Sequence, residues 1–110
     1  MADLAEIIER LQNNDHTLTS LNLQDNAIDA AGAQAIATVL EKNTTLTTLN
    51  LEVNRIRGAG TQSITTALEK NTTLTSLGLS MCNAAGAQSI ATALKKNTTL
   101  TSLDLSMCNI

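Results

Sequence analysis

Leucine residues recur in this sequence in a pattern that repeats four times. Each copy has the form Leu-x-x-Leu-x-Leu, and successive copies begin 28, 28 and 26 residues apart, at Leu18, Leu46, Leu74 and Leu100. Around the last two leucines of each copy, apolar and polar residues alternate with a period of two, which places the leucines on one side of a β-strand and the polar residues on the other. The pattern predicts four strands, near residues 18–23, 46–51, 74–79 and 100–105.

Between these strands, apolar residues are spaced by three and four positions, which is the spacing of a helix that buries one face. The positions are Ile36, Ala37 and Leu40, then Ile64, Ala67 and Leu68, then Ile90 and Leu94. Each predicted helix ends at a lysine followed by an asparagine, at Asn43, Asn71 and Asn97. Because asparagine tolerates a left-handed backbone, we expect these residues to end the helices in that conformation.

The alternation of one strand and one helix in each period determines how the units are arranged. Consecutive strands joined by a helix run parallel, with the helices together on one side of the sheet. The few aliphatic side chains of one unit do not offset the entropy lost when its backbone is ordered. We therefore expect the units to stabilise one another by stacking in a row.

The first residues of the chain lack the leucine pattern. Leu4, Ile7, Ile8 and Leu11 form one apolar stripe, and the positions around them are more charged than those of the later helices. This pattern predicts an N-terminal capping helix within residues 1–15, followed by repeats over residues 16–110. We expect no C-terminal cap, so the edge of the last strand is predicted to be exposed and able to pair with another chain.

Composition narrows the class of protein. The 110 residues are 43% hydrophobic, contain no Phe, Tyr or Trp, and carry a net charge of -3. This hydrophobic content is typical of a single folded domain, here with an aliphatic core. No apolar run is long enough to span a membrane, and no basic run would neutralise the phosphates of a nucleic acid. We expect a cytoplasmic protein that binds neither membranes nor nucleic acids.

The segment from Leu21 to Leu49, and the motif Asn-Thr-Thr-Leu-Thr at positions 43–47, 71–75 and 97–101, resemble the ribonuclease-inhibitor-like class of leucine-rich-repeat proteins. This class includes repeat domains of innate-immune receptors, tropomodulin-like proteins and effectors of intracellular bacteria. The resemblance implies an α/β fold, a right-handed leucine-rich-repeat solenoid in a horseshoe arc, with a parallel concave sheet and outer helices. It also implies that the concave sheet face binds a protein partner.

The outward positions of the four strands are the candidate partner-binding residues. They vary more between repeats than the leucines do, and they include no Trp, Tyr or Arg, the residues most frequent at binding hot spots. They are Ser20, Asn22, Gln24, Thr48, Asn50, Glu52, Ser76, Ser80, Ser102, Asp104 and Ser106. Arg55 and Arg57, on the loop after the second strand, form the one close arginine pair; they either bind a carboxylate of a partner or are solvated loop charges.

The sequence offers little for catalysis, so we expect a protein that is not an enzyme and holds no cofactor or metal. His16, the only histidine, is predicted to lie in a surface loop. Cys82 and Cys108 stand in the column that holds Asn26 and Asn54. The resemblance implies that this asparagine bonds the turn after the strand, and a thiol can replace it as a weak donor. In-register parallel strands give poor disulfide geometry, so we predict free, buried thiols.

The third repeat is two residues shorter than the first two. Three residues separate Cys82 from Gly86, whereas five separate Asn26 from Gly32. The shorter connection predicts the weakest internal stacking, or a local distortion, at residues 83–87.

Three functions remain open from the sequence. The first is a protein-interaction module that binds an unknown protein partner on the concave face. The second is a homodimer or structural fragment that self-associates through the exposed C-terminal strand edge. The third, which depends on the resemblance, is a bacterial effector that is secreted into a host cell and acts on host proteins.

Overall fold

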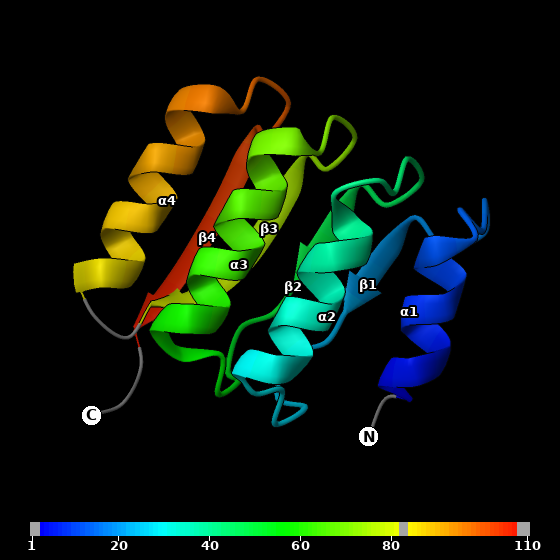
Figure 1. Cartoon of the computed structure of the whole chain (residues 1–110), viewed down its shortest axis with the longest axis horizontal. Helices are drawn as coiled ribbons and strands as arrows, with labels where there is room; N and C mark the ends of the chain where they lie inside the picture. The colour runs from blue at the N-terminus through cyan, green and yellow to red at the C-terminus, as the bar shows by residue number, and fades with distance from the viewer. Residues whose placement is uncertain (1–2, 82–83, 108–110) are drawn as a thin grey trace.

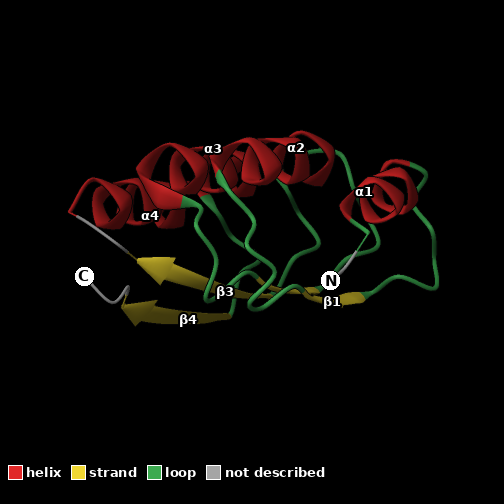
Figure 2. Ribbon diagram, turned by 90° about the horizontal axis from the view of Figure 1, so that it is seen from below, coloured by secondary structure: helices red, strands yellow, loops and turns green. Residues whose placement is uncertain are grey.

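The computed structural model describes residues 3–81 and 84–107, which alternate between helices and strands (Figure 1). The elements are α1 (Leu4–Gln12), β1 (Ser20–Asn22), α2 (Ala30–Leu40), β2 (Thr48–Asn50), α3 (Arg57–Lys70), β3 (Ser76–Met81), α4 (Ala84–Lys96) and β4 (Ser102–Met107). The helices form one layer and the strands form a second layer beside it (Figure 2). We call the face of the sheet that is turned away from the helices the open face.

The four strands form one parallel sheet in the order β1-β2-β3-β4. Leu21 is in register with Leu49, Leu49 with Leu77, and Leu77 with Leu103. The predicted α/β fold, with parallel strands and the helices on one side, is confirmed. The equivalent leucines of the four repeats line up in one column of the sheet.

The regular strands β1 and β2 are only three residues long, shorter than the leucine pattern predicts. Directly after β1, an asparagine side chain joins the backbone hydrogen bonds between the first two repeats. Asn54 Nδ2 donates a hydrogen bond to Leu23 O (2.9 Å), and Asn54 Oδ1 accepts hydrogen bonds from Asn26 N (3.0 Å) and Ile28 N (2.9 Å). The role that the resemblance implies for this column, bonding the turn after the strand, is therefore present at Asn54.

Two predictions concern residues outside the described part of the chain. Cys82 and Cys108 are not described, so free, buried thiols stay a prediction. The distortion predicted at residues 83–87 also begins outside the described ranges, and α4 is described from Ala84 onward.

The core is a continuous row of aliphatic side chains between the helices and the sheet. In the two central repeats the leucines are at most 1% exposed: Leu46, Leu49, Leu51, Leu74, Leu77 and Leu79. At one end α1 packs against α2, and Leu11 is buried. At the other end Leu94 and Leu105 are 44% and 41% exposed. Burial therefore decreases at the last repeat, where no further described repeat covers the leucines.

The asparagines after the helices do not adopt the left-handed conformation that we expected. Asn71 has φ -74° and ψ 135°, which is extended backbone, and neither Asn43 nor Asn97 has a positive φ. The reason is that the side chain joins two repeats. Asn71 Nδ2 donates to Leu40 O at 2.7 Å, while its Oδ1 accepts from Leu74 N at 2.7 Å. The prediction was wrong because it considered only the backbone of the helix end.

Asn43 and Asn97 make the same contacts in their own repeats. Asn43 Nδ2 donates to Leu11 O (2.9 Å), and Asn97 Nδ2 donates to Leu68 O (2.7 Å). We call Asn43, Asn71 and Asn97 the asparagine ladder. Each member donates a hydrogen bond to a carbonyl near the C-terminal end of the helix one repeat earlier: α1 for Asn43, α2 for Asn71 and α3 for Asn97. The last carbonyls of a helix have no partner within the helix itself. The ladder therefore connects each repeat to the one before it.

Candidate functional site

The eleven predicted partner-binding residues lie on the four strands or directly after β1 and β2. They alternate with leucines along each strand, and this alternation places the eleven side chains on the open face. On the edge strands, Ser20, Asn22, Ser102 and Asp104 are exposed and Ser106 is half-buried, whereas those of the eleven that lie on β2 and β3 are half-buried. The structure therefore brings all eleven onto one surface, seen edge-on in Figure 2.

Asn22 and Asn50 hold the chain where it leaves β1 and β2. Asn22 Oδ1 accepts a hydrogen bond from Gln24 N (3.1 Å), and Asn50 Oδ1 accepts one from Glu52 N (2.9 Å). Asn50 Nδ2 also donates to Gln24 Oε1 (3.3 Å), which connects the two repeats. Because these side chains are already bonded, this part of the polar surface is pre-organised.

Gly78 interrupts the row of polar side chains formed by Asn22, Asn50 and Asp104. A Cβ atom at this position would lie 2.7 Å from Glu52 Oε1 and 3.0 Å from Asn50 Oδ1. The side chains of Glu52 and Asn50 therefore lie over Gly78, which is buried.

The four strands contain no Lys or Arg. The centre of the open face is thus polar and acidic.

Val53, directly after Glu52, has an unusual backbone conformation. Its φ is 55°, in the left-handed region, where a residue other than glycine is strained by about 1–2 kcal/mol. Its N–H donates to Ser80 Oγ (2.8 Å), and Ser80 Oγ also lies 3.0 Å from Ser106 Oγ. The Val53 side chain is 53% exposed. Burial of this side chain therefore contributes little to offset the strain.

The N-terminus of α3 lacks the cap that α2 has. At α2, the Asp29 side chain accepts a hydrogen bond from Gly32 N (2.9 Å). At α3 the equivalent residue is Arg57, which has φ 60°, and the helix has no side-chain cap. A missing cap costs about 1 kcal/mol, and a positive charge opposes the helix dipole. We expected Arg57 in the loop after the second strand. It is instead the first residue of α3.

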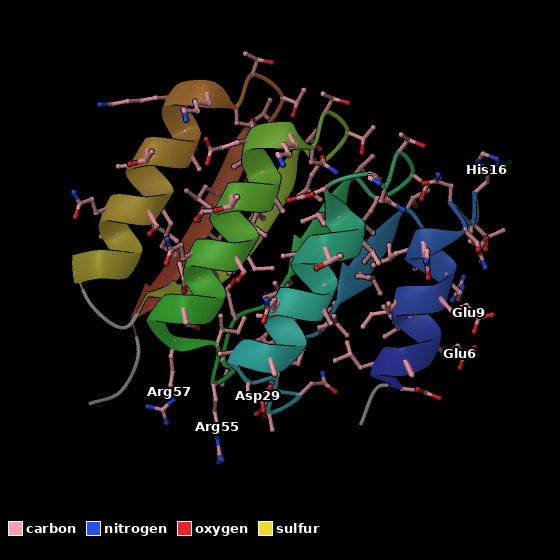
Figure 3. All side chains as sticks on the ribbon, in the orientation of Figure 1. Glu6, Glu9, His16, Asp29, Arg55 and Arg57 are labelled. Carbon is pink, nitrogen blue, oxygen red and sulfur yellow. The ribbon has the colours of Figure 1, made fainter. Side chains whose placement is uncertain are left out.

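Arg55 and Arg57 extend from the same edge of the molecule, the edge where α2 and α3 begin (Figure 3). Both are exposed. The arginine pair was predicted from the sequence, but the strained backbone at Val53 and the missing cap at the start of α3 were not. An alignment with the first repeat could have indicated both features, because that repeat has Asp25 where Val53 stands and Asp29 where Arg57 stands.

The ionisable groups with clearly shifted pKa values lie at the other edge, near the C-terminal ends of the helices. Hydrogen bonds from Thr17 and from Arg10 hold the pKa of Asp15 far below its usual range. A hydrogen bond to Glu69, at 2.8 Å, raises the pKa of Lys96. These are exposed ion pairs, of the kind that contributes little to stability.

His16 is exposed in the turn between α1 and β1. In the part of the chain that the structure describes, no three His, Cys, Asp or Glu side chains are grouped so that they could hold a metal ion. None of the helices described has both the length and the apolar character needed to cross a membrane.

Comparison with known protein families agrees with the repeats seen in the structure. A family model described as Leucine Rich repeat matches residues 14–37, 42–64 and 96–110. The chain therefore belongs to the leucine-rich-repeat family.

Two solved structures show how far the likeness extends. Leiomodin-1 actin-binding site 2 is 30% identical in sequence with a TM-score of 0.72, and the match covers 96% of this chain and 80% of that chain. The tropomodulin C-terminal domain from Caenorhabditis elegans is 14% identical with a TM-score of 0.74, and the match covers 99% and 86% of the two chains. At 14% identity the second likeness supports the fold alone. No curated protein matches the chain in sequence.

Proposed function

We propose that this protein is a non-enzymatic interaction module that binds a protein partner on its open face, and that the partner is actin. The observation that carries the proposal is the 30% identity to leiomodin-1 actin-binding site 2 over 96% of this chain. The open face supports it, because its polar residues are gathered on one side of the sheet and no described element packs over them.

Gly78→Asn is the substitution that tests the open face most sharply. The other three repeats have Asn22, Asn50 and Asp104 at this position, so the strand tolerates such a side chain. The new side chain displaces the flexible end of Glu52, which changes the centre of the face. We expect binding to actin filaments to weaken about tenfold in co-sedimentation. The free energy of unfolding should change by no more than about 0.5–1 kcal/mol, because glycine is not required by the backbone here.

The matched control changes the helix layer instead. Gln34, Gln62 and Gln88 are equivalent, exposed residues of α2, α3 and α4. Replacing all three with alanine should leave binding within twofold of the original chain. Failure of the unaltered protein to bind actin filaments or actin monomers would overturn actin as the partner. Loss of binding in the triple variant, with full binding by Gly78→Asn, would overturn the open face as the site.

A second candidate function, self-association, is favoured by the exposed leucines of the last repeat. Leu94 and Leu105 are 44% and 41% exposed, whereas the equivalent Leu68 and Leu79 are 2% and 0% exposed. On its outer side β4 pairs with no described strand. A two-fold dimer that joins the outer edges of two β4 strands would cover these leucines and satisfy the open backbone groups.

Light scattering over a range of protein concentrations tests the dimer. The mass should rise from 11.6 kDa toward twice that value as the concentration increases. Leu105→Glu should remain monomeric, because it places a charge in the contact. Gln88→Glu, on the exposed side of α4, should dimerise as the unaltered chain does. A monomer at every concentration would contradict this second function and leave the first untouched.

A further inference from the structure

Residues 53 and 57 differ in type from the equivalent residues of the first repeat. Val53 is in the left-handed conformation, where the first repeat has Asp25, a residue that adopts it readily. Arg57 stands where the first repeat has the capping residue Asp29, and α3 has no side-chain cap. Both changes work against the stability of the fold. Departures of this kind are expected at functional positions.

The exposed side chains of this segment form a surface that we call the arginine rim, defined as Val53, Arg55 and Arg57. All three residues are exposed, and Arg55 and Arg57 lie at the same edge of the molecule (Figure 3). Among the residues that the structure describes, neither Arg55 nor Arg57 has an ion-pair partner, whereas Arg10, Lys70 and Lys96 are paired with acids.

Asp29 of the neighbouring repeat forms no ion pair with either arginine of the rim, among the contacts of the described residues. Asp29 pairs with Arg55 through the backbone, in an isolated parallel bridge. The Asp29 carboxylate, however, caps α2 by accepting the hydrogen bond from Gly32 N. The two guanidinium groups are therefore available to acids from outside the chain.

We propose that the arginine rim is a second contact surface, separate from the open face, that binds an acidic peptide segment of a protein partner. Arginine pairs with carboxylates through two parallel hydrogen bonds, and Val53, two residues before Arg55 in the sequence, is an exposed apolar residue. Arginine is also enriched at binding hot spots, and the open face has none. A nucleic acid is the poorer fit, because the chain carries a net charge of -3 and the rim holds only two basic residues.

The test uses NMR titration of the full chain with two synthetic peptides. One alternates Glu and Leu, and the other has Gln in place of every Glu. We expect saturable shifts of the backbone amides of residues 53–58 with the acidic peptide and none with the Gln peptide. A single-stranded thymidine oligonucleotide serves as the alternative anionic probe, and saturable binding of it at the same amides without binding of the acidic peptide would overturn the proposal.

The decisive variant combines Val53→Asn with Arg57→Asn. Asparagine tolerates the left-handed conformation and is a good helix cap, so the urea midpoint of this variant should rise. Its affinity for the acidic peptide should fall about tenfold. Lys42→Asn, which removes the same single charge from an exposed residue just after the C-terminal end of α2, should leave the affinity within twofold.

Two results would overturn the proposal. Unchanged affinity in the Val53→Asn, Arg57→Asn variant would show that the segment does not bind the peptide. A lower urea midpoint in the same variant would show that these residues serve the fold, and the departures from local rules would no longer point to a partner.

Discussion

Replacing Asn71 with alanine is expected to lower the free energy of unfolding by about 3–5 kcal/mol. The Asn71 side chain donates to Leu40 O and Asn43 O and accepts from Thr73 N and Leu74 N. Asn71 is only 3% exposed, so water has little access to these groups. Each buried backbone group left without a partner costs about 1–3 kcal/mol. Because small domains are stable by about 5–15 kcal/mol, this variant should unfold in mild urea.

Asn97→Ala is the matched control, because it removes the same side chain at the end of the ladder. Asn97 is half-buried and bonds Leu68 O, Thr99 N and Leu100 N. Water can replace part of these bonds, so the expected loss is about 1–2 kcal/mol. Urea unfolding followed by far-UV circular dichroism measures both variants. Equal losses at Asn71 and Asn97 would contradict the claim that burial determines the cost.

Much of the fold could be predicted from the sequence because the leucine pattern is repeated. A single Leu-x-x-Leu-x-Leu segment is a weak signal, but four copies at nearly constant spacing predict both the strands and their parallel order. The register of Leu21, Leu49, Leu77 and Leu103 then follows, because equivalent positions of stacked repeats lie side by side.

The asparagine ladder could not be predicted, because its bonds join residues far apart in sequence. Asn71 bonds a carbonyl 31 residues earlier, at Leu40. Our prediction instead used only the local sequence, in which a lysine followed by an asparagine is typical of a helix C-terminus. The tertiary hydrogen bonds override that preference, because a buried carbonyl without a partner is costly.

At the candidate site, alternation along the strands placed the eleven polar residues on one face, and their binding role remains a prediction. Alternation does not tell which of these side chains lie over a neighbour, so the contact of Glu52 with the Gly78 position was not predicted. The left-handed backbone at Val53 was not predicted either, because valine rarely adopts it. A comparison between repeats identifies Gly78, since its equivalents are Asn22, Asn50 and Asp104, whereas Val53 differs in type only from Asp25.

Leu79→Ala is the second substitution with a large expected effect. Leu79 is fully buried in β3, and removing a buried leucine side chain beyond Cβ costs about 2–5 kcal/mol. Leu105 occupies the equivalent position in β4 and is 41% exposed, so Leu105→Ala should cost about 1 kcal/mol or less. Urea unfolding measures both variants. A loss at Leu105 as large as the loss at Leu79 would show that the last repeat is covered in solution.

Amide hydrogen exchange in the Leu79→Ala variant tests most directly whether each repeat is stable only against its neighbours. Three amides report on the three interfaces between repeats: Leu23 N bonds Asn50 O, Leu51 N bonds Gly78 O, and Thr101 N bonds Thr75 O. If the repeats depend on one another, all three amides lose protection in the variant, with the smallest loss at Leu23. If Leu23 and Leu51 keep their original protection while β3 exchanges rapidly, the repeats are independently stable and the account is wrong.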